Sequence, residues 1–145
     1  MRAIVQRVKE ANVTVNGREI SRIKAGFLLL VAVRVGDTPA QAKKMGDKIA
    51  HLRILPDEVG KMNLSLLDLK QDVLLVSQFT LYGDTVKGNR PSFIESAGSD
   101  EARPLLEMLA DELRVHGLAV QTGAFGEHME IGLINDGPVT VIIET

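Results

Sequence analysis

DVLLVSQFTL, residues 72–81, is a run of apolar residues that ends in polar ones. Its apolar part is typical of a strand buried on both faces of a sheet, so we expect a strand from Asp72 to Leu81. Ser77, Gln78 and Thr80 stand at the end of this run, where side chains are well placed to line a site. Alternatively, Ser77 and Thr80 bond the local backbone and Gln78 faces water.

The residues before this stretch alternate in the manner of strands and then change to a helical spacing. Asn16-Gly17 is a strong turn signal between two strands. Thr38, Pro39 and Gln41 have the form of a helix start with a capping box. We expect strands at 4–8, 13–15, 19–24 and 27–35, and a helix whose apolar stripe is Ala42, Met45, Ile49 and Leu52.

The residues after it continue the mixed pattern. Residues 82–96 contain Gly83, Gly88 and Pro91 without periodicity, which indicates a long loop, and long ordered loops are often functional. A second helix is expected, with Ser99 as its cap and Gly117 at its end. Further strands are expected at 118–122, 129–135 and 139–143. We therefore expect one α+β domain over residues 1–145, with a twisted, barrel-like sheet, mostly antiparallel or mixed, and two helices.

Composition sets limits on the function. The chain has 145 residues, 45% of them hydrophobic, and no cysteine, which excludes thiol nucleophiles and thiolate metal sites. Without a long apolar segment we expect a soluble, cytoplasmic protein. The net charge of -2 conceals a basic segment at 1–24, with a local charge of +4, and an acidic one at 95–112, with -5. Such segregation usually means solvated surface, but it can also attract phosphate.

Few catalytic chemistries fit these residues. His51, His116 and His128 have no metal-ligand spacing and are interpreted as structural or solvent-facing. The chain has no glycine-rich phosphate loop and no nucleophile-elbow sequence. Hydroxyls, a carboxamide and backbone N–H groups remain at the end of the 72–81 stretch. Such groups suit the stabilisation of charge on a carbonyl oxygen under attack.

Residues 135–140 read NDGPVT, which in isolation is a turn between two strands. The same chain, however, contains SQFTLYGD at 77–84, KGNRPSF at 87–93 and an amino terminus reading MRAIVQRV. Together these motifs resemble the D-aminoacyl-tRNA deacylase family, and the resemblance covers all 145 residues.

The resemblance implies an activity and a set of site residues. Family members hydrolyse the ester between a D-amino acid, or glycine, and the terminal adenosine of tRNA. They are homodimers with active sites at the subunit interface and need no metal or other cofactor. Ser77, Gln78, Phe79 and Thr80 match the first site motif of the family.

The resemblance also assigns roles to residues distant from this motif. Gly137 and Pro138 match a second motif, in which a cis Gly-Pro bond directs its carbonyls into the partner's site and rejects L-amino acids. Arg7 matches a residue that holds this element in place. Phe125 and Met129 match positions that line the adenosine and amino-acid pocket.

Two positions depart from the family pattern. Gly83 stands where many members have alanine, and Asn89 where a basic residue is common. Asn89 would weaken the attraction of this loop for phosphate, whereas neither change removes a residue of the two site motifs.

Two mechanisms fit these motifs. In the first, the Phe79 backbone N–H, supported by Gln78 and Ser77, stabilises the ester oxygen while the ribose 2′-hydroxyl activates water. In the second, Thr80 is the nucleophile of an esterase or amidase, although the sequence supplies no base to activate it. A tRNA-end binding module without turnover is the non-enzymatic alternative.

Overall fold

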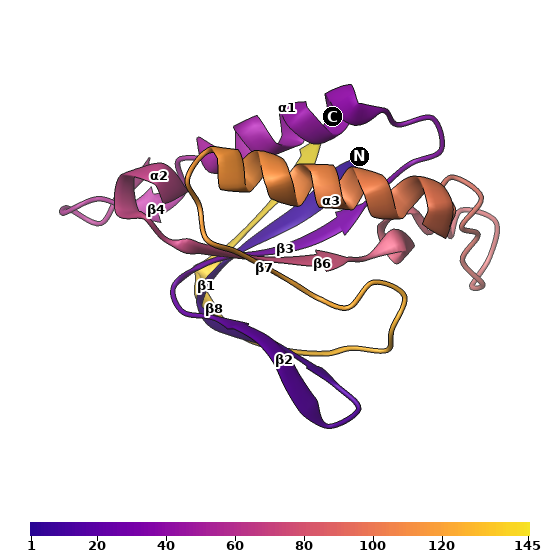
Figure 1. The fold of residues 1–145 in the computed structure, drawn as a ribbon, viewed down its shortest axis with the longest axis horizontal. Coiled ribbons are helices and arrows are strands. Elements are labelled where there is room, and N and C mark those ends of the chain that lie inside the picture. The colour runs from indigo at the N-terminus through magenta and orange to yellow at the C-terminus, as the bar shows by residue number, and fades with distance from the viewer.

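The sheet is built around β1 (Arg2–Val15), the long strand against which three others pair (Figure 1). The structure is a computed structural model that describes residues 1–145. β8 (Glu130–Glu144) runs antiparallel along one edge of β1, and β3 (Gly26–Ala32) and β2 (Arg18–Ile23) share the other edge. β6 (Asp72–Ser77) and β7 (Val120–Thr122) extend the sheet beyond β3 in parallel. The expected mixed sheet is therefore confirmed.

Helices α1 (Pro39–Ala50) and α3 (Ser99–Val115) lie side by side over one face of this sheet (Figure 1). They are the two long helices that the sequence predicts. The segment between α1 and β6 forms a small hairpin, β4 (Leu55–Pro56) and β5 (Met62–Leu64), followed by the single turn α2 (Leu66–Leu69). No helix of the structure combines the length and apolar character needed to cross a membrane.

Two apolar clusters fill the two sides of the sheet. The larger one lies between the sheet and the helices and includes Phe27, Leu29 and Leu109. The smaller one includes Leu28, Leu74 and residues of β1 and β2 on the opposite face. Because neighbouring residues of β3 and β6 belong to opposite clusters, both strands are buried on both faces, as their unbroken apolar runs predict. The twisted sheet thereby curls around the smaller cluster into a barrel-like form.

Two strand predictions were wrong in the same way. The expected strands at 4–8 and 13–15 are one strand, β1, and those at 129–135 and 139–143 are one strand, β8. The β1–β8 ladder shifts register between Gln6 and Val8 and again between Val8 and Glu10. Extra residues at these irregularities interrupt the alternation of side chains, so a continuous strand resembles two strands in sequence.

The helix termini follow local rules with small differences. The capping box of Thr38 and Gln41 is confirmed, with Pro39 as the first helical residue. α1 ends at Ala50, so Leu52 packs against the core from outside the helix. In α3 the cap is Gly98 rather than Ser99, since the Gly98 carbonyl accepts from Ala102 N at 2.9 Å.

Candidate active site

The strand β6 ends at Ser77 because its partner in the sheet ends there. Val31 and Ser77 form the last residue pair between β3 and β6, and Gln78 N still donates to Val31 O at 2.8 Å. The chain then leaves the sheet and enters a 3-10 turn, η1 (Phe79–Tyr82). The expected strand over 72–81 is therefore correct only as far as Ser77.

The turn η1 places backbone donors at the end of the strand. A helical turn leaves its first N–H groups without partners inside the turn, and here these belong to Phe79 and Thr80. Gln78, which precedes the turn, makes no side-chain cap to them. The internal bonds are Leu81 N to Gln78 O at 3.1 Å and Gly83 N to Thr80 O at 2.9 Å. Two N–H groups thus remain free to bind an oxygen.

Long-range contacts hold η1 in position. Ser96 Oγ, from the end of the 83–96 loop, donates to Phe79 O at 2.6 Å. Arg2 Nη1 donates to Leu81 O at 2.7 Å, and the Arg2 guanidinium lies 4.8 Å from the centre of the Tyr82 ring. Tyr82 is buried, and this burial, with Asp37 nearby, raises the pKa of its hydroxyl.

The side chains of the first motif do not all point the same way. Gln78 Nε2 donates to Thr80 Oγ1 at 2.5 Å, so the amide of Gln78 and the hydroxyl of Thr80 are paired. Phe79 is 53% exposed, and its ring meets that of Phe93 edge to face, with centroids 5.2 Å apart. Thr80 is exposed and faces solvent rather than a cavity.

A cavity of about 460 Å³ collects most of the expected site residues. Ser77, Gln78 and Phe79 line one side, and Phe125 and Met129, from the segment between β7 and β8, line another. Phe125 packs against the larger apolar cluster and Met129 against the smaller one. The cavity therefore lies where the two apolar clusters approach each other, and Thr80 is the only member of the first motif outside its lining.

The second motif lies elsewhere, within β8 rather than in a turn. The Gly137-Pro138 peptide bond is cis, and both residues are exposed. Gly137 has φ +123°, and a Cβ there would lie 3.0 Å from Arg7 Nη2. The backbone conformation therefore favours glycine, and a side chain here would also crowd Val139 and Arg7. Neither Gly137 nor Pro138 lines the cavity of its own chain.

Arg7 anchors this second motif to the rest of the fold. Its side chain is only 11% exposed. Nε lies 3.2 Å from Asp136 O and 3.0 Å from Asp136 Oδ2, while Nη1 donates to Ile54 O at 2.7 Å. The guanidinium therefore joins β8 to the segment that follows α1.

The cavity also contains residues that the sequence did not single out. His128 and Glu127 line it, between Phe125 and Met129, and both are exposed. Gly98 and Ser99 line it at the N-terminus of α3. His128 is solvent-facing, as expected, but its position between two pocket residues was the available signal that it also faces the cavity. His51 and His116 lie at the ends of α1 and α3.

The arrangement favours binding and charge stabilisation over strong acid or base chemistry. No three His, Asp or Glu side chains are grouped in a way that could hold a metal ion. No histidine or carboxylate forms a hydrogen bond with Ser77 or Thr80. An apolar wall, exposed aromatic rings and free N–H groups suit an uncharged ester whose carbonyl oxygen gains charge during the reaction.

Comparisons with known proteins identify the family of this chain. The family model of D-Tyr-tRNA(Tyr) deacylase matches residues 4–144. The chain is 56% identical over 145 residues to the D-aminoacyl-tRNA deacylase of Thermomicrobium roseum, covering 100% of this chain and 94% of the relative. It is 55% identical to that of a Geobacillus species, covering 100% and 95%.

Two solved structures share the fold of this chain over almost its whole length. The protein named c-Myc DNA Unwinding Element Binding Protein superposes with a TM-score of 0.93 at 38% identity, covering 100% of this chain and 99% of that one. A eukaryotic protein described as a probable D-amino acid tRNA deacylase shares the fold, with a TM-score of 0.85 at 19% identity, covering 98% and 97%. The family match over almost the whole length and the full-length relatives establish that this chain belongs to the D-aminoacyl-tRNA deacylase family.

Proposed function

We propose that residues 1–145 form a single deacylase domain that acts in the cytoplasm on mischarged tRNA. Its substrate is the ester between a D-amino acid, or glycine, and the terminal adenosine of tRNA. Hydrolysis returns free tRNA and keeps D-residues out of translation. The observation that carries this proposal is the cavity lined by Ser77, Gln78 and Phe79 on one side and by Phe125 and Met129 on the other, next to the free N–H groups of η1.

The Phe79 N–H is the oxyanion donor in this proposal. It stands at the start of η1 without a side-chain cap, immediately after the two cavity residues Ser77 and Gln78. As water attacks the ester carbonyl, the oxygen gains negative charge and the N–H bond to it strengthens. A fixed donor of this kind is worth about 2.7 to 4 kcal/mol in the transition state. The Ser96 hydroxyl on Phe79 O helps to fix this turn.

Water rather than Thr80 is the proposed nucleophile. The Thr80 hydroxyl oxygen already accepts from Gln78 Nε2, which lowers its electron density, and no base contacts it. Thr80 also lies outside the cavity lining. The ribose 2′-hydroxyl is adjacent to the ester in every aminoacyl-tRNA and can orient and activate the attacking water. The 3′-oxygen of the ribose then leaves with a proton, and the amino acid is released as the free acid.

The complete site is proposed to need two chains. Gly137 and Pro138 are exposed and do not reach the cavity of their own chain, although Arg7 anchors them firmly. The same strand, β8, presents the apolar side chains of Ile134, 51% exposed, and Ile142, 66% exposed. An exposed apolar strand of this kind is suited to pairing with a second copy. The Gly137 and Pro138 carbonyls of one chain would then face the cavity of the other.

Chirality is proposed to be selected by exclusion. If backbone carbonyls stand close to the α-carbon of the substrate, an L side chain collides with them, whereas a D side chain points away. This exclusion by backbone carbonyls does not depend on which side chain the substrate carries. It therefore accepts many D-amino acids, and it accepts glycine because glycine has no side chain to exclude.

The test of the proposed function compares one tRNA carrying D-tyrosine, L-tyrosine or glycine. We expect release of D-tyrosine and glycine and little release of L-tyrosine. Binding without any release would support the tRNA-end binding module, and an acyl group trapped on Thr80 would support the threonine esterase. Rapid hydrolysis of the L-tyrosyl ester by the intact protein would contradict the chirality filter. Substrate with a 2′-deoxy terminal adenosine should be hydrolysed at least about a hundredfold more slowly.

The shared site has its own test. Gln78→Ala and Gly137→Val place a defect on each side of the proposed interface. Mixed dimers of the two variants contain one site with both defects and one with neither. After unfolding and refolding together, the mixture should regain about a quarter of the wild-type selective activity, because random assortment makes half the dimers mixed. No regain in a mixture that forms dimers would contradict a site shared between chains.

A further inference from the structure

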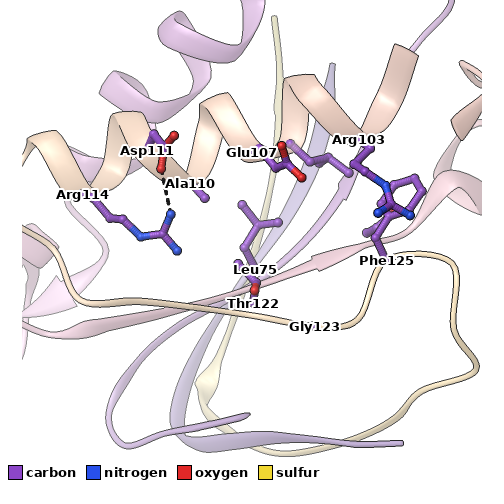
Figure 2. A pocket seen from close by; sticks show the side chains of 11 residues that line it. Leu75, Arg103, Glu107, Ala110, Asp111, Arg114, Thr122, Gly123 and Phe125 are labelled. Atoms are coloured by element: carbon purple, nitrogen blue, oxygen red, sulfur yellow. Dashed lines mark hydrogen bonds and ion pairs between the residues drawn. The ribbon is translucent and has the colours of Figure 1, made fainter. Parts of the chain in front are cut away.

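A second cavity, of about 350 Å³, adjoins the candidate active site. Figure 2 shows the side chains that line it. It lies between one face of α3 and the ends of β6 and β7. It shares Ser77, Leu106 and Phe125 with the first cavity, so the two cavities adjoin at these residues. A substrate longer than one nucleoside can therefore extend from the first cavity into the second.

The wall shared by the two cavities carries a flat cation on an aromatic ring. The Arg103 guanidinium lies 4.8 Å from the centre of the Phe125 ring (Figure 2). Arg103 makes no ion pair within the chain, so its planar head is held by Phe125 alone. Guanidinium and phenyl planes are the usual platforms on which single-stranded bases stack.

The charges of the second cavity balance. Its charged lining residues are Arg103, Arg114, Glu107 and Asp111. Arg114 is already committed, with Nη1 on Asp111 Oδ1 at 2.8 Å and Nη2 on Val120 O at 3.4 Å. Glu107 has no hydrogen-bond or ion-pair partner. The free carboxylate of Glu107 offsets the one unpaired arginine, Arg103, so this cavity suits an uncharged heterocycle with an amino group better than it suits a phosphate.

The backbone of β7 completes the polar edge of this cavity. β7 is the last strand of its sheet, so one side of it has no partner strand. Gly123 N donates to Leu75 O at 2.9 Å, which turns Gly123 toward β6 and, by alternation, turns Thr122 away from it. Thr122 lines the cavity, and its N–H and C=O, which point to the free side of β7, form a donor and an acceptor side by side. The amino group and ring nitrogen of cytosine match this pair.

We propose that this second cavity is a subsite for the nucleobase that precedes the terminal adenosine, a cytosine in the CCA end of tRNA. The base stacks on the Arg103–Phe125 pair, and its amino group donates to Glu107 and to Thr122 O while its ring nitrogen accepts from Thr122 N. Uracil places an oxygen opposite Glu107 and is disfavoured. This inference rests on the proposed function, because it assumes that the first cavity holds the terminal aminoacyl-adenosine.

The test measures binding, so that it does not depend on turnover. The probes are non-hydrolysable 3′-amide analogues of D-tyrosyl-adenosine, D-tyrosyl-cytidylyl-adenosine and D-tyrosyl-uridylyl-adenosine. The wild-type protein should bind the cytidylyl analogue about tenfold more tightly than the adenosine analogue, and the uridylyl analogue should lose most of that gain. Hydrolysis of D-tyrosyl-tRNA by the same preparation tests the proposed function separately.

Three variants on α3 distinguish the loss of a nucleobase subsite from a general loss of ligand binding. Arg103→Ala should abolish the gain from the added nucleotide, and Glu107→Gln should abolish the preference for cytidine over uridine. Glu101→Gln is the matched control, since it removes an exposed acid on a different face of the same helix and should retain both. Equal wild-type affinity for the adenosine and cytidylyl analogues would overturn the inference. So would an equal loss of affinity for both analogues in Arg103→Ala and Glu107→Gln, which would place the terminal adenine itself in this cavity.

Discussion

The Arg7 side chain contacts both the backbone and the carboxylate of Asp136, with Nε 3.2 Å from the Asp136 carbonyl oxygen and 3.0 Å from Asp136 Oδ2. The two residues are far apart in sequence, on β1 and β8, and the contact lies immediately before Gly137 and Pro138. The element proposed to reject L-amino acids is thus positioned by a planar side chain that is mostly buried. Its geometry depends on a fork of donors rather than on positive charge alone.

Replacing Arg7 by lysine tests this dependence. A single ammonium cannot reach Asp136 and Ile54 O together, so the Gly137-Pro138 segment should lose its fixed position. We expect the ratio of D- to L-tyrosyl-tRNA hydrolysis to fall about tenfold or more and the free energy of unfolding to fall by about 1 to 3 kcal/mol. Kinetic assays and urea titration measure the two effects. Arg22→Lys, in an exposed ion pair with Glu19, is the control and should leave both nearly unchanged. An unaltered D-to-L ratio in Arg7→Lys would show that Arg7 does not position the filter.

Thr80→Val tests the identity of the nucleophile. The substitution keeps the shape of the side chain and removes the hydroxyl that accepts from Gln78 Nε2. If water is the nucleophile, kcat should fall by less than about tenfold, because the variant loses only the hydrogen bond that holds the Gln78 amide, while Gln78 itself remains in the cavity lining. Single-turnover hydrolysis of D-tyrosyl-tRNA measures the effect. A fall of about 10⁴ or more with unchanged substrate affinity would identify Thr80 as the nucleophile and overturn the proposed mechanism.

Gly83→Ala tests the packing between Gly83, which follows η1, and the Phe93 ring. Gly83 has φ -65° and ψ 115°, which alanine adopts without strain, but the new Cβ would lie 2.9 Å from Phe93 Cε1 and 3.0 Å from Thr80 O. The Phe93 ring, which packs edge to face on Phe79, must therefore shift. We expect a loss of about 1 to 3 kcal/mol in the free energy of unfolding. In a Phe93→Leu background the same substitution should cost less, and a double-mutant cycle by urea titration measures the difference. Equal costs in both backgrounds would show that the Phe93 ring is not what opposes the alanine.

The raised pKa of Tyr82 predicts that the free energy of unfolding falls at alkaline pH. Burial, with Asp37 nearby, raises the pKa of its hydroxyl, while Arg2 opposes the shift. Because the folded state favours the neutral phenol, this contribution to stability is complete below the unfolded pKa of about 10 and is lost as the pH rises through the folded pKa. Tyr82 is the only tyrosine and the chain has no tryptophan, so ultraviolet absorbance reports its ionisation directly. The midpoint should be higher in the folded protein than in urea. Equal midpoints would contradict the burial argument.

Much of the fold was predictable because it follows from neighbouring residues. The apolar run 73–76 predicts a buried strand, the capping box of Thr38 and Gln41 predicts a helix start, and Asn16-Gly17 predicts a turn. Each of these depends on residues within a few positions of one another. The family could also be recognised from the motifs at 77–84 and 135–140, since these are stretches of contiguous sequence.

The errors have a common cause in contacts between distant residues. β1 and β8 are each continuous along the ladder that joins them, and the register shifts of this ladder interrupt the alternation of apolar and polar residues in their sequences. β6 ends at Ser77 because β3 ends beside it. The sequence of either strand alone does not contain the position of its partner.

The sequence by itself determined which residues are the candidates for the chemistry: Ser77, Gln78 and Phe79 at the end of a buried strand and Gly137-Pro138 in a second motif, in a chain without cysteine. Only the tertiary structure decided how they are grouped. It turned Thr80 to solvent, placed His128 in the lining of the same cavity as Phe125, and placed Arg103 over the Phe125 ring, which both cavities share. Residue types follow from local sequence, whereas distances between side chains follow from the packing of α3 and of the segment between β7 and β8 against the sheet, which brings residues remote in sequence into contact.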